Sequence, residues 1–203
     1  MLAVLSEVKN PTEEMAMKRI FAVMALLTTS AFPILGLAKG DLVRIEVVGA
    51  NFGAPLVVSD ADILKQLFIW SGPGAGQPIG SPQSADARSF IDWYKGIAED
   101  VPDGMDAYDV SFFCVFDKQK PDGRLTYSVK YAFDPSTNRG YIYLPGPREN
   151  NYGINVSTVV HDVEGHWFNA SNRWESLVAP LIREHAARRV GEVAAKVRFA
   201  RRD

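Results

Sequence analysis

Two histidines and a glutamate lie close together in the segment HDVEGH, residues 161–166. Imidazole nitrogens and carboxylate oxygens bind metal ions of intermediate hardness, so His161, Glu164 and His166 are candidate ligands for a metal-assisted hydrolase. Helical zinc-enzyme patterns place two histidines four residues apart, whereas these lie five apart with Gly165 between them. The spacing therefore favours a polar turn before the final helix, and the metal-assisted hydrolase is kept as the alternative.

A second group of candidates consists of aromatic residues in and after a glycine-rich loop. The segment WSGPGAGQPIGSP begins at Trp70, and its glycines and prolines predict a loop that ends near Ser84. Trp70, Trp93 and Tyr94 offer flat apolar surfaces that can bind a ligand without chemistry. The loop lacks the Lys-Ser/Thr pair of a P-loop and the three-glycine dinucleotide fingerprint. No cofactor is therefore expected, and no residue is assigned a catalytic role.

The N-terminal region predicts export. A basic pair at 18–19 precedes an apolar run at 20–27, and the small residues Gly36 and Ala38 favour cleavage before Lys39. An uncleaved membrane anchor is the alternative that the length of the apolar stretch leaves open. After cleavage the protein is periplasmic or secreted. The predicted organisation is an upstream extension from a misassigned start (1–16), a signal peptide (17–38), one globular domain (39–183) and a basic helical tail (184–203).

Charge and cysteine content narrow the possible partners. The 203-residue chain has 22 Lys and Arg against 24 Asp and Glu, so its net charge of -2 gives no reason to expect nucleic acid. The single cysteine, Cys114, cannot form an intrachain disulfide, and its apolar neighbours predict a buried thiol. Basic residues that could make a weak contact with an anionic surface gather in the tail: Arg188, Arg189, Arg198, Arg201 and Arg202.

Apolar alternation and turn signals predict a mostly antiparallel sheet of about five strands. The two longest apolar segments flank a Pro-Asp-Gly turn, which is typical of a hairpin. In the second arm of this hairpin Thr126, Ser128 and Lys130 alternate with apolar residues, so we expect them to face water. The expected strands are 41–48, 108–116, 124–133, 141–144 and 152–160, and 56–58 is a further short apolar piece.

Capping residues predict where helices begin. A side-chain oxygen at Ser59 or Asp60 can accept the first amides of a short helix at 62–67. A C-terminal helix begins near Asn172 and must kink or restart at Pro180. Because the sheet has one aromatic face, we expect a single α+β domain in which that face packs against the C-terminal helix.

Several sequence segments, taken in their order along the chain, resemble those of a group of short exported bacterial proteins of unknown function. The segments are PLVVSDADILKQLFIWSGPG, SFIDW, YIYLPG and VEGHWFNASNRWESLVAPLI, and the resemblance covers roughly residues 41–183. The resemblance implies a bacterial exported protein and carries over no activity, cofactor or catalytic residue. We therefore expect a non-enzymatic envelope domain that binds a ligand or another envelope protein.

Overall fold

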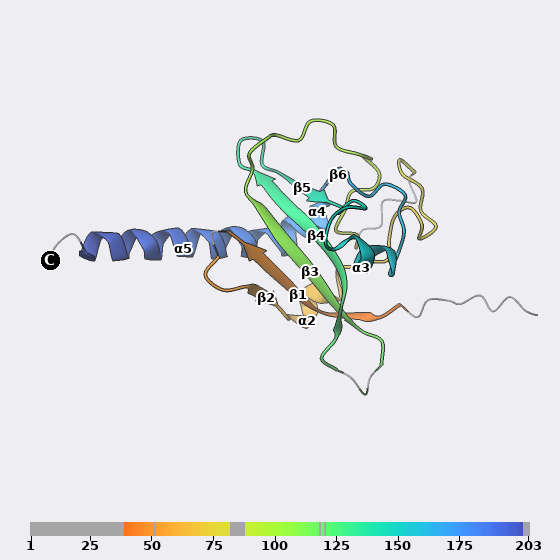
Figure 1. Cartoon of the computed structure of the whole chain (residues 1–203), viewed down its shortest axis with the longest axis horizontal. Coiled ribbons are helices and arrows are strands. Elements are labelled where there is room, and N and C mark those ends of the chain that lie inside the picture. Colours follow the sequence, from red (N-terminus) through yellow and green to blue (C-terminus); the bar gives the residue numbers. More distant parts are fainter. Residues whose placement is uncertain (1–38, 51, 82–87, 118, 120, 201–203) are drawn as a thin grey trace, which may run out of the picture. The chain divides into compact units, whose positions relative to one another are not determined.

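The computed structural model describes residues 39–50, 52–81, 88–117, 119 and 121–200. The predicted extension and signal peptide, as well as Arg201 and Arg202 of the tail, lie outside these residues. In the described part, six strands form one antiparallel sheet, so the expected α+β domain is confirmed with one strand more than predicted (Figure 1). The elements are β1 (Asp41–Gly49), β2 (Leu56–Val58), α2 (Ala61–Leu64), β3 (Ala107–Val115), β4 (Arg124–Asp134), β5 (Arg139–Tyr143), α3 (Tyr152–Val156), β6 (Trp167–Asn169), α4 (Asn172–Leu177) and α5 (Ala179–Ala200).

The six strands lie side by side in the order β2-β1-β3-β4-β5-β6. The alternation of apolar residues in the sequence accounts for the central strands. Ile45 and Val47 of β1 are fully buried, and they lie opposite Phe112 and Val110 of β3. The predicted hairpin is confirmed, because β3 pairs with β4 and places Phe112 opposite Tyr127. This register gathers aromatic and branched side chains on one face of the sheet, where their burial stabilises the domain.

The C-terminal helices cover the aromatic face, as the sequence predicted. Trp174 of α4 is fully buried, with its ring centroid 6.1 Å from that of Phe112 and 5.7 Å from that of Tyr131. Ile182 of α5 is buried in the same core. Glu175 of α4 accepts the Tyr131 hydroxyl at 2.9 Å, so a hydrogen bond as well as apolar packing holds the helices on the sheet.

The break between α4 and α5 follows from the capping and proline residues. The Ser171 hydroxyl oxygen accepts the backbone N–H of Trp174 at 3.1 Å and begins α4. That helix ends at Leu177, and α5 begins at Ala179. Pro180 has no N–H to donate, and its ring crowds the preceding turn. The predicted restart of the helix is therefore confirmed.

The prediction of a strand at 152–160 is wrong, because Tyr152–Val156 is the helix α3. Its buried residue Asn155 satisfies the backbone of Ser128 on β4. The Ser128 N–H donates to Asn155 Oδ1 at 2.8 Å, and Asn155 Nδ2 donates to the Ser128 carbonyl at 2.6 Å. Strand β5 pairs with β4 only beyond this point, from Lys130 onward. The asparagine amide thus takes the place of a strand neighbour, and this tertiary contact outweighs the local β preference of the segment.

The prediction that Thr126 and Ser128 face water is also wrong. These side chains are 3% and 1% exposed. The segment around α3 covers them: the Thr158 hydroxyl donates to the Thr126 carbonyl at 2.6 Å, and Asn151 Nδ2 donates to Ser128 Oγ at 2.9 Å. Strand β4 does alternate, but its polar side lies beneath α3 and the residues that flank this helix, which supply matching hydrogen-bonding groups.

The thiol of Cys114 is fully buried, as expected from its apolar neighbours. Burial raises the pKa of this thiol to about 11, so it is protonated at neutral pH and a poor nucleophile.

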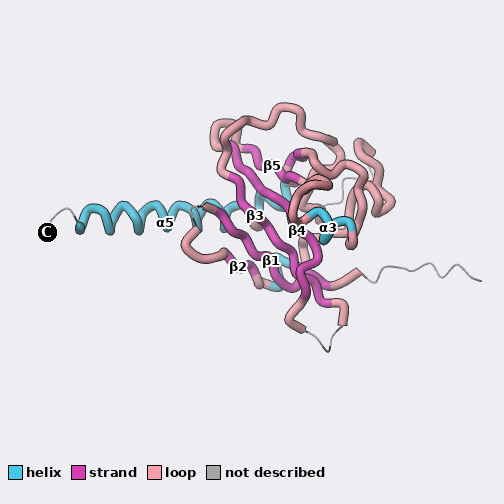
Figure 2. The backbone as a smooth tube through the Cα atoms, in the orientation of Figure 1, coloured by secondary structure: helices cyan, strands magenta, loops and turns pink. Residues whose placement is uncertain are grey.

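Among the helices that the structure describes, none combines the length and the apolar character that a bilayer crossing requires. Figure 2 shows that long loops and the short helix α3 lie at one end of the sheet.

Candidate ligand-binding site

The histidine-containing turn is built around a buried imidazole. The His161 side chain is 2% exposed, and its ring centroid lies 4.8 Å from that of Trp93 and 6.0 Å from that of Tyr127. Its Nδ1 donates to the Pro73 carbonyl, because a carbonyl oxygen can only accept. Burial lowers the pKa of His161, although the Pro73 carbonyl and the nearby acidic side chains oppose the shift. The neutral ring thus holds the glycine-rich loop against the core.

The other two predicted metal ligands, Glu164 and His166, have different environments. The Glu164 carboxylate accepts the backbone N–H groups of His161 at 2.7 Å and of Val163 at 3.1 Å, so it closes the turn. His166 is exposed, and its Nδ1 lies 3.3 Å from the Val163 carbonyl. Across the described residues, no group of three His, Cys, Asp or Glu side chains is arranged to hold a metal ion. The structure therefore does not bring the three candidates together as a metal centre.

The predicted aromatic candidates have unequal access to solvent. Trp93 is 1% exposed, between the rings of His161 and Phe168 at 4.8 and 5.0 Å. Gly72 passes over its indole so closely, with a φ of +95°, that a β-carbon at this position would overlap the ring. Trp93 is consequently a core residue without an accessible face. Tyr94, by contrast, is 55% exposed.

A pocket of about 540 Å³ opens where β2 departs from β1, and we call it the edge pocket. Strand β2 pairs only with the segment 45–47 of β1. The chain then turns into α2, where Asp60 Oδ1 accepts the N–H groups of Asp62 at 2.7 Å and Ile63 at 3.3 Å. This cap directs the chain away from β1. Among the described residues, the segment 41–44 of β1 therefore has no strand partner on that side.

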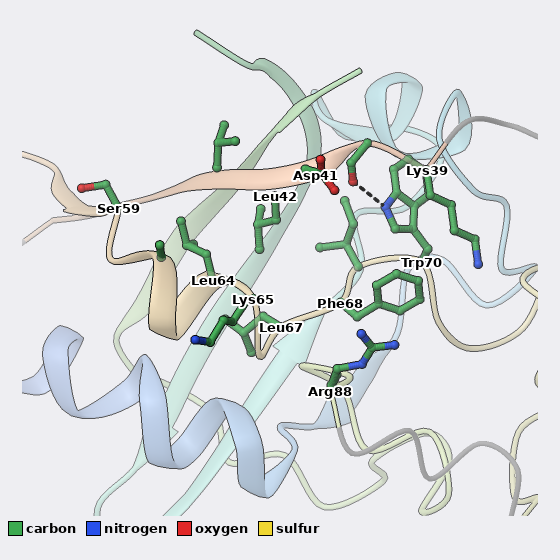
Figure 3. Close-up of a pocket in the computed structure, with 14 residues that line it drawn as sticks. Lys39, Asp41, Leu42, Ser59, Leu64, Lys65, Leu67, Phe68, Trp70 and Arg88 are labelled. Atoms are coloured by element: carbon green, nitrogen blue, oxygen red, sulfur yellow. Dashed lines mark hydrogen bonds between the residues drawn. The ribbon is translucent and has the colours of Figure 1, made fainter. Parts of the chain in front are cut away.

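The edge pocket has one backbone wall and one apolar wall (Figure 3). Residues 39–43 form the first wall, and Leu64, Leu67, Phe68 and Trp70 contribute to the second. Trp70 Nε1 donates to the carbonyl of residue 40 at 3.4 Å, which joins the two walls at one end. Of the three predicted ligand-binding aromatics, Trp70 is the one that lines this pocket, and it is 7% exposed.

Two cations lie against the Phe68 ring in the edge pocket. Lys39 Nζ and Arg88 Cζ are each 5.0 Å from the ring centroid, on different sides of it (Figure 3). The two charges are thus at most about 10 Å apart, one Debye length at 0.1 M salt, so both act on an anion in the pocket. A third cation, Lys65, is paired with Asp62 at 2.5 Å, and one acid, Asp41, also lines the pocket. The charged side chains that line the pocket are thus three basic residues and one acidic residue, a composition that suits a negatively charged ligand.

The basic tail is partly engaged within the domain. Arg188 pairs with Glu184 one helical turn earlier. The Arg189 guanidinium lies against Gly53, where a β-carbon would overlap it. Arg198 belongs to α5, and its side chain is not among those described. The described part of the tail thus contacts its own domain.

Lys39, Phe68 and Arg88 are the site residues that the sequence did not indicate. They are far apart in the chain, and no motif links them; only the departure of β2 and the course of the segment after α2 bring them together. The sequence shows only that Lys39 is a charged residue and Phe68 an aromatic residue next to predicted elements, and neither property points to a shared site. Comparison with family models, with curated proteins and with solved structures finds no match to this chain.

Proposed function

We propose that the protein is an exported bacterial envelope protein that binds a ligand with an anionic group in the edge pocket. The observation that supports this function is the Phe68 ring with Lys39 and Arg88 on either side of it, in a pocket with an apolar wall. Ligand pockets combine an apolar lining with a few charged groups that fix orientation. The apolar wall would bury a hydrocarbon or aromatic body, and the combined field of the two cations would attract a carboxylate.

The ligand function can be tested with a small probe that carries both features. We expect 3-phenylpropionate to bind the full chain with a millimolar dissociation constant, about -4 kcal/mol. Its neutral amide should bind at least about tenfold more weakly, because it cannot pair with Lys39 and Arg88. Isothermal titration gives the affinities, and chemical-shift changes of backbone amides locate the site.

Two alanine variants make the test specific to the pocket. Phe68→Ala should weaken 3-phenylpropionate binding by about tenfold, since stacked and buried aromatic contacts contribute about 1 kcal/mol or more. Tyr94→Ala removes an exposed aromatic ring outside the pocket and should leave the affinity unchanged. Equal affinity of the acid and the amide, or equal loss in both variants, would contradict the proposed site.

Export is a separate part of the proposal and has its own readout. Cleavage before Lys39 would leave this residue, with a new α-ammonium group, at the rim of the edge pocket. The intact mass of the protein from an exported fraction should correspond to a chain that begins at Lys39. A full-length mass in the membrane fraction would instead support the uncleaved anchor.

A further inference from the structure

The long edge of β1 is only partly covered. Its nine residues pair with β3 from Asp41 to Gly49, with a bulge between Leu42 and Arg44. On the opposite side, β2 pairs with just three residues, 45–47. The segment 41–44, which we call the open edge, therefore presents backbone groups with no strand partner on that side in the described part of the chain. Such an edge is a template for another strand.

The open edge and the edge pocket occupy the same place. Four of the residues that line the pocket, 40–43, belong to or immediately precede the first half of β1. The facing wall contains Leu64 and Leu67, which are each 4% exposed. A strand added beside β1 would lie about 4.8 Å from it and span the open edge with about four residues, or roughly 13 Å. Every second side chain of that strand would point toward one face of the sheet, where the apolar wall lies.

The charges in the pocket specify what such a strand should carry. Lys39 precedes the open edge, and Arg88 lies on the other side of the Phe68 ring. A carboxylate on the added strand, at its C-terminus or on an acidic side chain, would lie in the combined field of these two cations. A small aromatic acid could fill the pocket, but it would leave the backbone groups of the open edge to water.

We infer that the ligand of the edge pocket is an extended peptide segment with a carboxylate, which adds to the sheet as a strand beside residues 41–44. This inference rests on the proposed function of the pocket and specifies its ligand class. Main-chain hydrogen bonds to β1 provide affinity that is largely independent of the peptide sequence. The apolar wall selects hydrophobic side chains at alternate positions, and the cations select the carboxylate.

A set of three peptides separates strand addition from simple anion binding. The first is acetyl-Thr-Val-Thr-Phe with a free carboxylate, the second is its C-terminal amide, and the third is the free acid with alternate backbone amides N-methylated. The first should bind the full chain and slow hydrogen exchange of the backbone amides in the open edge. The amide form should bind at least about tenfold more weakly, because it loses its charge. N-methylation should cause a similar loss and abolish the exchange protection, because it removes strand donors.

A matched pair of lysine variants tests the direction of the charge effect. Lys39→Gln should reduce the preference for the free acid over the amide by several-fold. Lys95→Gln removes one positive charge from an exposed lysine that does not line the pocket, and it should leave that preference unchanged. Both side chains are exposed, so neither variant is expected to disturb folding.

Each outcome of these titrations bears on one proposal or on both. Equal binding of the N-methylated and unmodified acids would overturn strand addition and leave anion binding intact. Binding of 3-phenylpropionate but of no peptide would have the same consequence. Protection of the open edge that rises with protein concentration in the absence of peptide would assign it to a second copy of this chain and overturn the inference. If neither 3-phenylpropionate nor any peptide binds, the proposed function of the pocket fails as well.

Discussion

The edge pocket and the turn at residues 161–166 contain similar residue types in opposite settings. In the turn, His161 packs against the rings of Trp93 and Tyr127. The imidazole of His161 and the carboxylate of Glu164 are already hydrogen-bonded to backbone groups. In the edge pocket, the Phe68 ring meets two cations at an accessible gap in the sheet. Aromatic and charged residues stabilise the fold where their groups are already paired and buried, and they can bind a ligand where a cavity leaves them accessible.

The two regions should therefore differ in how substitutions affect the free energy of unfolding and the ligand affinity. Substitutions in the turn should alter the free energy of unfolding with little direct effect on ligand affinity. Substitutions in the edge pocket should do the reverse.

Trp93→Ala should give the largest loss of stability. The indole is 1% exposed and packs against His161 and Phe168, so its removal leaves a cavity in the core. Loss of a buried tryptophan lowers the free energy of unfolding by about 3–5 kcal/mol. Urea denaturation measures the change, with Tyr94→Ala as the exposed control at within about 0.5 kcal/mol. Similar values for the two variants would mean that Trp93 is not the core residue described here.

Glu164→Ala should produce the next largest effect. The carboxylate accepts two backbone N–H groups, those of His161 and Val163, and its loss leaves both without this acceptor. An unsatisfied buried donor costs about 1–3 kcal/mol. Glu99→Ala, at an exposed position, serves as the control for removing one negative charge. If the turn were instead a ligand site, Glu164→Ala would change binding of 3-phenylpropionate more than it changes stability.

How much of this contrast the sequence could predict depends on the range of the contacts involved. The strand β1, the β3–β4 hairpin and the helix restart at Pro180 were predictable because alternation, a turn and a proline act within a few residues. Helix α3 was not, because the partner of Asn155 lies 27 residues earlier on β4. A local pattern contains no information about such a partner.

The same limit applies to the candidate site. Trp70 was a predicted ligand residue and does line the edge pocket, but Lys39, Phe68 and Arg88 meet there only after the sheet has formed. The burial of Trp93 could not be predicted from the local sequence either, because the residues that cover it, Gly72 and His161, come from separate segments. Residue type indicated which side chains could bind, while the tertiary fold decided which of them are accessible.

The pH dependence of stability should distinguish the turn from the pocket. Burial lowers the pKa of His161, so the folded protein binds this proton less tightly than the unfolded chain, whose histidine pKa is near 6.5. The stability contribution is complete above pH 6.5 and declines as the pH falls toward the folded pKa, with a slope of at most about 1.4 kcal/mol per pH unit.

The histidine variant isolates this contribution. His161→Gln should be less stable at neutral pH but should show a flatter decline of stability between pH 6.5 and 5 than the unsubstituted protein. Denaturation curves at a series of pH values measure the slope. His166→Gln is the matched control, because this histidine is exposed. An unchanged slope in His161→Gln would assign the pH dependence to other groups.

The smallest effect is expected at the rim of the edge pocket. Lys65 and Asp62 form an ion pair with side chains that are 68% and 83% exposed. Water and salt screen such pairs, so Lys65→Ala should change the free energy of unfolding by less than about 0.5 kcal/mol. The double variant Lys65→Gln with Asp62→Asn removes the whole pair and leaves the local net charge unchanged, so it should bind 3-phenylpropionate as tightly as the unsubstituted protein does. A several-fold loss of affinity would show that Lys65 leaves Asp62 for the ligand, and the anionic selectivity of the pocket would then rest on three cations.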